Sequence, residues 1–305
     1  MHLHRVALRF SNAEQQYQAV NKVMDILLNS MTGLNREHLK ALDWSLNEIT
    51  DNVLSHAKSP VGGFIQASTY SQSKRVEFIV ADAGIGIPES LKISNHEKAL
   101  LEAIKEGITN NKETNQGNGL FGSQRVASMS GGEFQIHSCR ASLQSKQNNP
   151  PEVTKQKIPY PGTVVQCLMD CTSPRLLEEA LRFNNKPHDP PFDFIEREYT
   201  DQSGEHMILH MNEHLKYLGS REAGAALRNK IFSLLSCVPP DKKLRIDFSG
   251  VSVISSSVAD EVFGMLFQEF GPMTFMSRLE LTGIDSTVRG LIDRAILLRT
   301  LNSKR

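Results

Sequence analysis

The sequence predicts two α/β domains joined by a linker. Its 305 residues exceed the roughly 100–200 residues of a typical single domain. Residues 184–191 combine Asn, Asp and three prolines in a run that can sustain neither a helix nor a central strand. After this run, strand-like and helix-like stretches alternate, which favours a layered domain with largely parallel strands. The expected divisions are an N-terminal helical segment at 1–34, a first domain at 35–170, a linker at 171–192 and a second domain at 193–305.

Charge and composition argue against several classes of protein. The chain has 34 basic and 34 acidic residues, so no global attraction to nucleic acid or to an anionic membrane is expected. No stretch approaches about 18 consecutive apolar residues, and the first residues make a poor signal peptide. None of the four cysteines forms a C-x-x-C pair, which fits free thiols in a reducing compartment. We therefore expect a cytoplasmic protein that binds neither membranes nor nucleic acid directly.

Hydrophobic periodicity predicts the elements of the first domain. Ser11 and Glu14 form an expected capping box for a helix that runs to about residue 31. A second helix begins near residue 35 and ends before Pro60. Residues 141–157 are polar and are interpreted as a long surface hairpin loop. The other expected elements are strands at 64–70, 75–81, 133–138 and 163–169 and helices at 97–106 and 121–129.

The second domain is predicted from the same patterns. A short helix is expected just after Cys171, before the linker proper. The alternating elements that follow are strands at 206–211, 244–248 and 278–282 and helices at 220–236, 257–270 and 285–300.

Glu48 and Asn52 lie four residues apart on the second predicted helix, so both side chains project from one face. The apolar residues of this helix form its core side. The helix edge therefore displays a carboxylate and a carboxamide together. Taken alone, this pair is more simply explained as part of a solvated helix face.

Two glycine-containing loops add further candidate residues. Asp82 ends an apolar strand, and Gly84 and Gly86 follow it. Glycine lets backbone approach a ligand closely, and Asp can accept a hydrogen bond from an exocyclic amine; an ordinary capped glycine turn is the alternative. Gly117 and Gly119 open a helix, where backbone amides suit a phosphate. This second loop lacks the lysine of a P-loop, and its context does not fit a dinucleotide fingerprint.

In their order and spacing, these elements resemble the GHKL superfamily of ATPases, which includes gyrase, heat-shock chaperone ATPases, histidine kinases and mismatch-repair ATPases. The resemblance covers about residues 35–170 and implies a two-layer α/β sandwich of Bergerat type that binds ATP with Mg²⁺. The segments that carry it are an asparagine box at 46–57, glycine boxes at 82–88 and 117–122, the Gly-Gly-Glu at 131–133 and the Gly-Thr at 162–163.

The resemblance implies a role for each matched polar residue. Asn52 would ligate Mg²⁺, which bridges the phosphates. Glu48 would be the general base in members that hydrolyse ATP or activate a hydroxyl. Asp82 would recognise the adenine amine, with Thr163 beside it.

The resemblance assigns roles to the glycines as well. Gly84 and Gly86 would let the backbone approach the nucleotide, and Gly117 and Gly119 would lie against the phosphates. The family often has a third glycine where this chain has Phe121, with a glycine one place later. This departure puts the detailed geometry of the phosphate loop in question.

Residues 244–264 resemble STAS domains of anti-anti-sigma regulators, so a smaller α/β STAS-like domain is expected to follow. In that family the second of two adjacent serines at a helix start is the phosphoacceptor, and Ser257 aligns with it. Val258 replaces the family glycine, and Ser255 replaces the acid before the pair. A serine at a helix start is also a common N-cap, so capping and phosphorylation are both interpretations of Ser257.

Three functions are compatible with this combination. The first is an ATP-binding regulatory protein, in which Mg-ATP binding or hydrolysis orders a lid at 89–116 and controls the STAS-like domain. The second is an anti-sigma-type serine kinase that phosphorylates Ser257 in cis or a serine of a partner. The third is a non-catalytic nucleotide-binding scaffold. The enzyme class stays open between an ATPase and a serine- or histidine-kinase-like phosphotransferase. The expected partners are ATP and a protein that meets the STAS-like domain, and a homodimer stays open.

Overall fold

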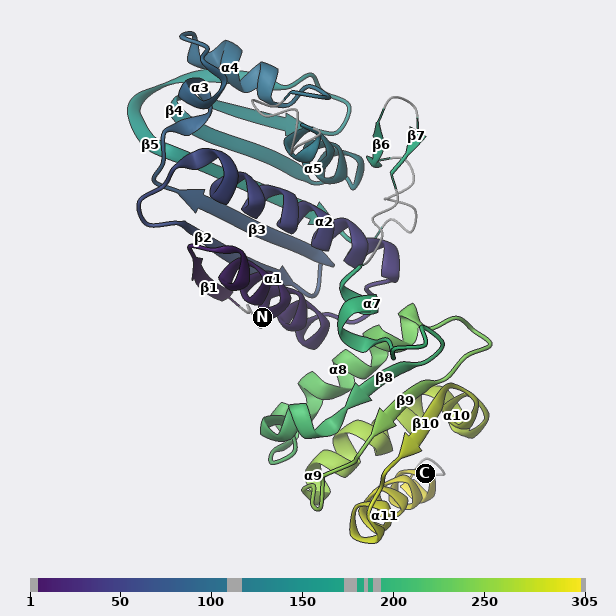
Figure 1. The fold of residues 1–305 in the computed structure, drawn as a ribbon. Coiled ribbons are helices and arrows are strands. Elements are labelled where there is room, and N and C mark those ends of the chain that lie inside the picture. The colour runs from purple at the N-terminus through teal and green to yellow at the C-terminus, as the bar shows by residue number, and fades with distance from the viewer. Residues whose placement is uncertain (1–4, 109–116, 173–179, 184–185, 189–192, 303–305) are drawn as a thin grey trace. The chain divides into compact units, whose positions relative to one another are not determined.

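The computed structural model describes residues 5–108, 117–172, 180–183, 186–188 and 193–302. The chain divides into two compact units. Unit 1 comprises the residues up to Leu27 together with Glu37–Asp193, and unit 2 comprises Leu28–Arg36 together with the chain from Phe194 onward. In each unit, helices pack with a β-sheet, so the α/β class expected for the chain is confirmed (Figure 1).

Unit 1 contains a five-stranded antiparallel sheet in the order β1-β2-β3-β5-β4. Along β3, buried positions alternate with less buried ones, as expected for a sheet with one face in the core. The strands are β1 (Arg5–Phe10), β2 (Gly63–Tyr70), β3 (Arg75–Asp82), β4 (Glu133–Lys146) and β5 (Glu152–Asp170).

Two parts of this sheet differ from the sequence prediction. β1 lies within the segment 1–34 that was expected to be helical, and it pairs with β2 along its whole length. The expected surface loop at 141–157 is largely strand, because β4 and β5 extend to a turn at 147–151. Ala141, Leu143 and Ser145 alternate on the buried face, while the polar residues between them made this strand look like a loop.

The helices of unit 1 include α1 (Ala13–Ser30), whose last residues belong to unit 2, α2 (Arg36–Asn52), α3 (Gly86–Leu91), α4 (His96–Ala103) and α5 (Gly119–Met129). Figure 1 shows α1, α2 and α5 on the same face of the sheet. The capping box of α1 is shifted one residue from the prediction. Asn12 Oδ1 accepts from the N–H of Gln15, whose side chain accepts in return from the N–H of Ser11, each at 2.9 Å.

A packed core lies between these helices and the sheet. It draws apolar side chains at helical spacing from α1 and α2 and at alternate positions from the strands. Fully buried members are Val23, Met24, Leu42, Leu46, Phe78, Phe134 and Ile136. This core fixes α2 against the sheet and thereby sets the direction of its polar edge.

Unit 2 contains the three parallel strands β8 (Met207–His210), β9 (Leu244–Asp247) and β10 (Leu279–Thr282), in the order β10-β9-β8. The predicted parallel pairing is thus confirmed. The predicted helix at 257–270 consists of three consecutive segments, the last of which is kinked at Gly271. The helices of this unit are α7 (Phe194–Tyr199), η2 (Met211–Tyr217), α8 (Arg221–Cys237), α9 (Ser256–Ala259), η3 (Asp260–Gly264), α10 (Met265–Arg278) and α11 (Ser286–Asn302).

Two further sequence predictions concern a short helix after Cys171 and the absence of a membrane-spanning helix. The short helix expected after Cys171 falls mainly on 173–179, outside the described residues. Over the part of the chain that the structure describes, no helix combines the length and apolar character needed to cross a membrane.

Candidate functional site

A cavity of about 350 Å³ opens in unit 1 among α2, the end of β3 and the start of α5. Its volume falls in the range of roughly 300–1,000 Å³ that is usual for small-molecule sites. Most of the predicted nucleotide-binding residues line it. They are Glu48, Asn52, Asp82, Gly86, Gly117, Gly119 and Thr163. The fold therefore gathers residues from well-separated parts of the sequence around one hollow.

α2 places Glu48 and Asn52 on adjacent turns, facing the start of α5. A Cβ atom on Gly119 would lie 2.6 Å from Oε2 of Glu48 and 3.5 Å from Nδ2 of Asn52. The first residue of α5 therefore sits directly over both side chains, and glycine is what permits this approach. The backbone N–H groups at the start of α5 are thus brought beside a carboxylate and a carboxamide.

Burial is the main cause of an unusual ionisation of Glu48. It raises the pKa of the Glu48 carboxyl to about 7, with a smaller contribution from the negative charge of Asp51. A carboxyl group with such a pKa can accept a proton near neutral pH, as a general base must. Perturbed carboxyl groups in cavities are typical of functional sites.

Asp82 lies at another part of the cavity, where β3 ends. Its Oδ1 accepts a hydrogen bond from the N–H of Gly84 at 2.8 Å. Burial raises the pKa of the Asp82 carboxyl, while hydrogen bonds from the backbone N–H groups of Gly84 and Thr163 oppose that rise. A buried carboxylate with hydrogen bonds on its flank is well suited to accept a further hydrogen bond from a ligand amine.

The loop after β3 is held closely against the end of α2. There α2 continues into a π-helical turn, η1 (Val53–Ala57). The carbonyl oxygen of Ala57 accepts from the N–H of Ile85 at 2.8 Å, and a Cβ on Gly84 would lie only 2.0 Å from the same oxygen. Gly84 therefore lets the Asp82 loop lie on η1 and does not itself line the cavity. Turns of π-helix are frequent at functional sites.

The strand pair β4–β5 supports the Asp82 end of the cavity. The hydroxyl of Ser138 accepts from the N–H of Ile87 at 2.9 Å, and it contacts the carbonyl oxygen of Gly162 at 2.9 Å and the Thr163 hydroxyl at 3.2 Å. The Tyr160 hydroxyl donates to the carbonyl oxygen of Asp82 at 3.0 Å. These contacts fix Thr163 beside Asp82.

Three aromatic residues that the sequence analysis did not select also line the cavity. Trp44 lies on α2 one turn before Glu48, while Phe183 and His188 come from the predicted linker. That segment folds into a small hairpin of β6 (Arg182–Phe183) and β7 (Lys186–Pro187) and belongs to unit 1. The signal for it was present in the apolar residues Leu181 and Phe183, both buried, within an otherwise polar stretch.

The departure at Phe121 has a structural explanation. Gly122 is a packing glycine, because a Cβ there would lie 2.3 Å from Cη2 of Trp44. The Phe121 ring lies 6.2 Å from that of Phe183, and the Arg125 guanidinium lies over Phe121 at 5.5 Å. This part of the second glycine box therefore holds α5 against α2 and the hairpin.

The donor set of the cavity fits magnesium held mainly by a nucleotide. Within the described residues, no group of three or more His, Cys, Asp or Glu side chains could hold a metal ion. Mg²⁺ typically takes one or two protein oxygens together with phosphate oxygens and water. The carboxamide of Asn52, beside the carboxylate of Glu48, is a suitable oxygen donor of this kind.

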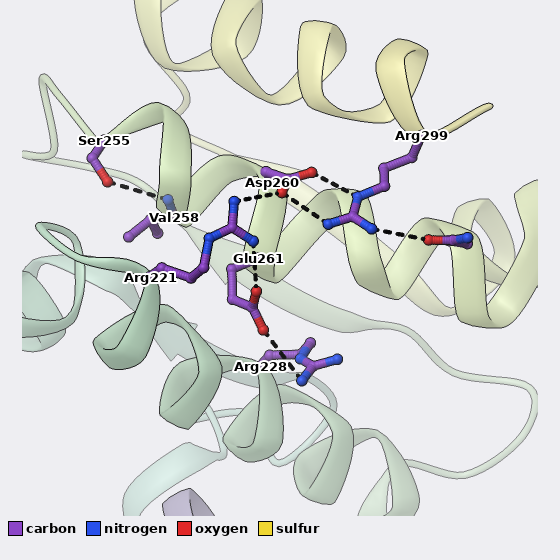
Figure 2. A network of polar contacts seen from close by, with 8 residues as sticks. Arg221, Arg228, Ser255, Val258, Asp260, Glu261 and Arg299 are labelled. Carbon is purple, nitrogen blue, oxygen red and sulfur yellow. Dashed lines mark hydrogen bonds and ion pairs between the residues drawn. The ribbon is translucent and has the colours of Figure 1, made fainter. Parts of the chain in front are cut away.

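Ser257 lies in unit 2 as the second residue of α9 and is half-buried. The capping interpretation of Ser257 is wrong, because Ser255 is the N-cap of this helix. The Ser255 hydroxyl accepts from the N–H of Val258 at 3.1 Å, as Figure 2 shows. Ser256 and Ser257 follow the cap residue, and their hydroxyls do not cap the helix.

A network of ion pairs fixes the chain just after these serines (Figure 2). Arg299 donates to Asp260 at 2.7 and 2.9 Å, and Arg221 donates to Asp260 at 3.0 Å and to Glu261 at 3.1 Å. Arg228 completes the network, 3.2 Å from Glu261. Hydrogen bonds from the arginines, that of Arg299 foremost, hold the pKa of Asp260 below its usual range. The network joins α8, η3 and α11.

Comparison with known protein families agrees with this geometry. The family of histidine kinase-, DNA gyrase B- and HSP90-like ATPases matches residues 38–170. A family described as a STAS-like domain of unknown function matches residues 223–289. No curated protein matches the chain.

Unit 1 thus combines a five-stranded antiparallel sheet, helices on one face of it and a cavity. Residues 38–170 form a GHKL-type ATPase domain, and a STAS-like domain follows at 223–289. The family assignment and the order of the two domains expected from the sequence are thus confirmed.

Proposed function

We propose that this protein is an ATP-dependent regulator, in which Mg-ATP bound in the cavity of unit 1 controls the STAS-like domain. The observation that most supports this is the row of Glu48 and Asn52 under Gly119, with Asp82 and Thr163 in the same cavity. The cavity offers an acceptor for an adenine amine and, elsewhere on its wall, backbone donors for phosphates and an oxygen ligand for Mg²⁺. This combination matches the chemistry of ATP.

The nucleotide would lie along α2. Asp82 accepts a hydrogen bond from the adenine amine, and Thr163 lies beside it. Asn52 holds Mg²⁺, which neutralises charge on the phosphates when bound. The backbone at Gly117 and Gly119 approaches the phosphates at the start of α5.

Glu48 would act as the base for hydrolysis. A water molecule gives its proton to the Glu48 carboxylate as its oxygen attacks the terminal phosphorus, and the bond to the ADP oxygen breaks. The products are ADP and inorganic phosphate. The pKa near 7 supports this role, because a base with a pKa close to the working pH transfers protons efficiently.

The connection between α1 and α2 offers a route for control of the STAS-like domain. Residues 28–36 belong to unit 2, where Ser233 Oγ of α8 donates to the carbonyl oxygen of Met31 at 2.9 Å. Asn229 of α8 likewise donates to the carbonyl oxygen of Asn29 at 3.2 Å. The next residues begin α2, which carries Glu48 and Asn52. Residues 28–36 are therefore held by α8 and continue directly into α2.

A serine kinase is the second candidate function. Ser256 is exposed and Ser257 is half-buried at the start of α9, and neither is the cap of that helix. A phosphoryl group from ATP would pass to Ser257 in cis or to a serine of a partner, with Glu48 taking the hydroxyl proton. Either function would be a cytoplasmic signalling role with a protein partner for the STAS-like domain, and a homodimer stays open.

Incubation with Mg²⁺ and ATP labelled on its γ-phosphate tests these functions. Free phosphate and protein-bound label are measured separately for the wild type, Glu48→Ala and Ser257→Ala. We expect free phosphate from the wild type and none from Glu48→Ala. Protein-bound label that disappears in Ser257→Ala would instead favour the kinase. If ATP binds and neither signal appears, the hydrolytic proposal is wrong, and a nucleotide-binding scaffold or a kinase that acts on a partner's serine is left.

A further inference from the structure

The cavity has a defined direction along α2. Trp44, Glu48, Asn52 and His56 follow one another at intervals of four residues, which correspond to steps of about 6 Å along a helix. Asp82 belongs to the end near Ala57, because the loop that follows it rests on the Ala57 carbonyl. Trp44 therefore marks the opposite end, beyond Glu48.

The β6–β7 hairpin closes this opposite end. The ring of His188 lies 6.3 Å from that of Trp44, edge-on, and 5.4 Å from that of Phe183. Phe183 in turn lies 6.2 Å from Trp44. His188 is thus held among aromatic rings at the wall of the cavity.

Two hydrogen bonds to backbone carbonyl oxygens hold the hairpin in place. The N–H of His188 donates to the carbonyl oxygen of Leu181 at 2.8 Å. Arg125 of α5 donates to the carbonyl oxygen of Arg182 at 3.1 Å. The hairpin is therefore anchored on the same helix whose first residue lies against Glu48 and Asn52.

The imidazole of His188 is available to a ligand. It is half-buried, lines the cavity, and forms no hydrogen bond with another described residue. Among the described residues that line the cavity there is neither Lys nor Arg. His56 lies at the Asp82 end, so the described ring N–H donors at the Glu48 end are the imidazole of His188 and the indole of Trp44.

We infer that His188 binds the terminal phosphate of a nucleoside triphosphate and makes the cavity distinguish ATP from ADP. This inference rests on the proposed nucleotide site and gives it a specificity-determining residue. With adenine at Asp82 and Mg²⁺ at Asn52, the phosphate chain would point past Glu48 toward Trp44 and His188. The hairpin lies outside residues 38–170, the region that matches the ATPase family. The terminal phosphate is therefore bound by a segment that follows this region.

Affinities of the full chain for ADP and for a β,γ-imido analogue of ATP, measured with Mg²⁺ by calorimetry, test the inference. In His188→Ala we expect the analogue to bind about tenfold more weakly, the effect of losing one hydrogen bond to a charged group. ADP affinity should be unchanged, and His188→Gln, which retains a donor, should recover part of the loss. Lys186→Ala, an exposed position on β7 of the same hairpin, is the control and should change neither affinity.

The outcomes separate the two proposals. Wild-type binding of both nucleotides, with the same analogue-to-ADP ratio in His188→Ala, would overturn the role of His188 and leave the nucleotide site intact. An equal loss of both affinities would also overturn it, since the residue would then support the cavity as a whole. Failure of the wild type to bind either nucleotide would overturn the proposed function and this inference together.

Discussion

Burial of the Glu48 carboxyl group supports its proposed role as a base but lowers the stability of the folded protein at neutral pH. A carboxylate removed from water loses hydration, so its ionised form is disfavoured and its pKa rises to about 7. The neighbouring charge of Asp51 adds to the cost. A side chain kept at such a position is better explained by a reaction than by packing, and stability–activity conflicts of this kind are common at active sites.

Replacing Glu48 by Gln should therefore stabilise the protein, in a pH-dependent way. The folded-state pKa is raised above the unfolded value, so the wild type loses stability as pH rises from about 4.5 to about 7. At pH 8, Glu48→Gln should raise the free energy of unfolding by about 1–3 kcal/mol, and at pH 5 about a quarter of that gain should remain. Urea unfolding at both pH values measures this.

Glu152→Gln provides the matched control, because Glu152 is exposed on β5. It should leave the free energy of unfolding unchanged at both pH values. A gain at pH 8 that is equal in the two variants would reflect overall charge, and no gain in Glu48→Gln would mean that Glu48 is well solvated.

At the scale of elements, the site depends on how closely α5 begins against α2. Gly119 is the contact point, with its Cα next to the side chains of Glu48 and Asn52. A methyl group there would need the space occupied by the Glu48 carboxylate.

Gly119→Ala should consequently displace Glu48 and lower ATP turnover by at least about tenfold, since small misplacements of a catalytic group are costly. Initial rates of phosphate release measure the effect. Gly290→Ala on α11 is the matched control: no neighbouring atom lies within 4 Å of its added Cβ, and the change should raise helix stability by about 0.5–1 kcal/mol without altering turnover. Equal turnover in Gly119→Ala and the wild type would show that α5 can retreat.

The elements that sequence reasoning predicted well are those with a strong period. α2 carries apolar residues at helical spacing, and β3 alternates cleanly, so both were expected with nearly their observed limits. The residues of the cavity were found through the family resemblance of the loops that follow such elements. Helical periodicity could place Glu48 and Asn52 on one helix, but the pKa of Glu48 depends on what covers it.

The elements that were missed depend on tertiary contacts. β1 is a short edge strand whose six residues become a strand by pairing with β2. The β6–β7 hairpin consists of two residue pairs and is held by Trp44 and α5, which lie far away in the sequence. Neither segment has a periodic pattern long enough to be recognised locally, and so the aromatic end of the cavity was not predicted.

At the scale of the whole molecule, the chain passes between the units three times, after Leu27, after Arg36 and after Asp193. Two of these crossings lie close in the sequence to segments that line the cavity. α2 begins at the second crossing, and the β6–β7 hairpin precedes the third by a few residues. If a ligand orders α2 or the β6–β7 hairpin, the change would therefore act on segments that continue directly into unit 2.

This connectivity predicts a measurable effect of nucleotide on α8. If nucleotide binding and the state of the STAS-like domain are coupled, the coupling is reciprocal and must appear as a change in local stability within unit 2. Binding of the β,γ-imido ATP analogue with Mg²⁺ should change amide hydrogen exchange in Arg221–Cys237, because Asn229 and Ser233 of this helix hold residues 28–36. Asp82→Ala, which removes the proposed acceptor for adenine, should abolish the change. Ser233→Ala should leave analogue affinity intact while reducing the effect on α8, since it deletes a buried hydrogen bond of the connection and touches nothing in the cavity. Exchange in α8 that is identical with and without bound analogue would mean that the ATPase domain and the STAS-like domain act independently.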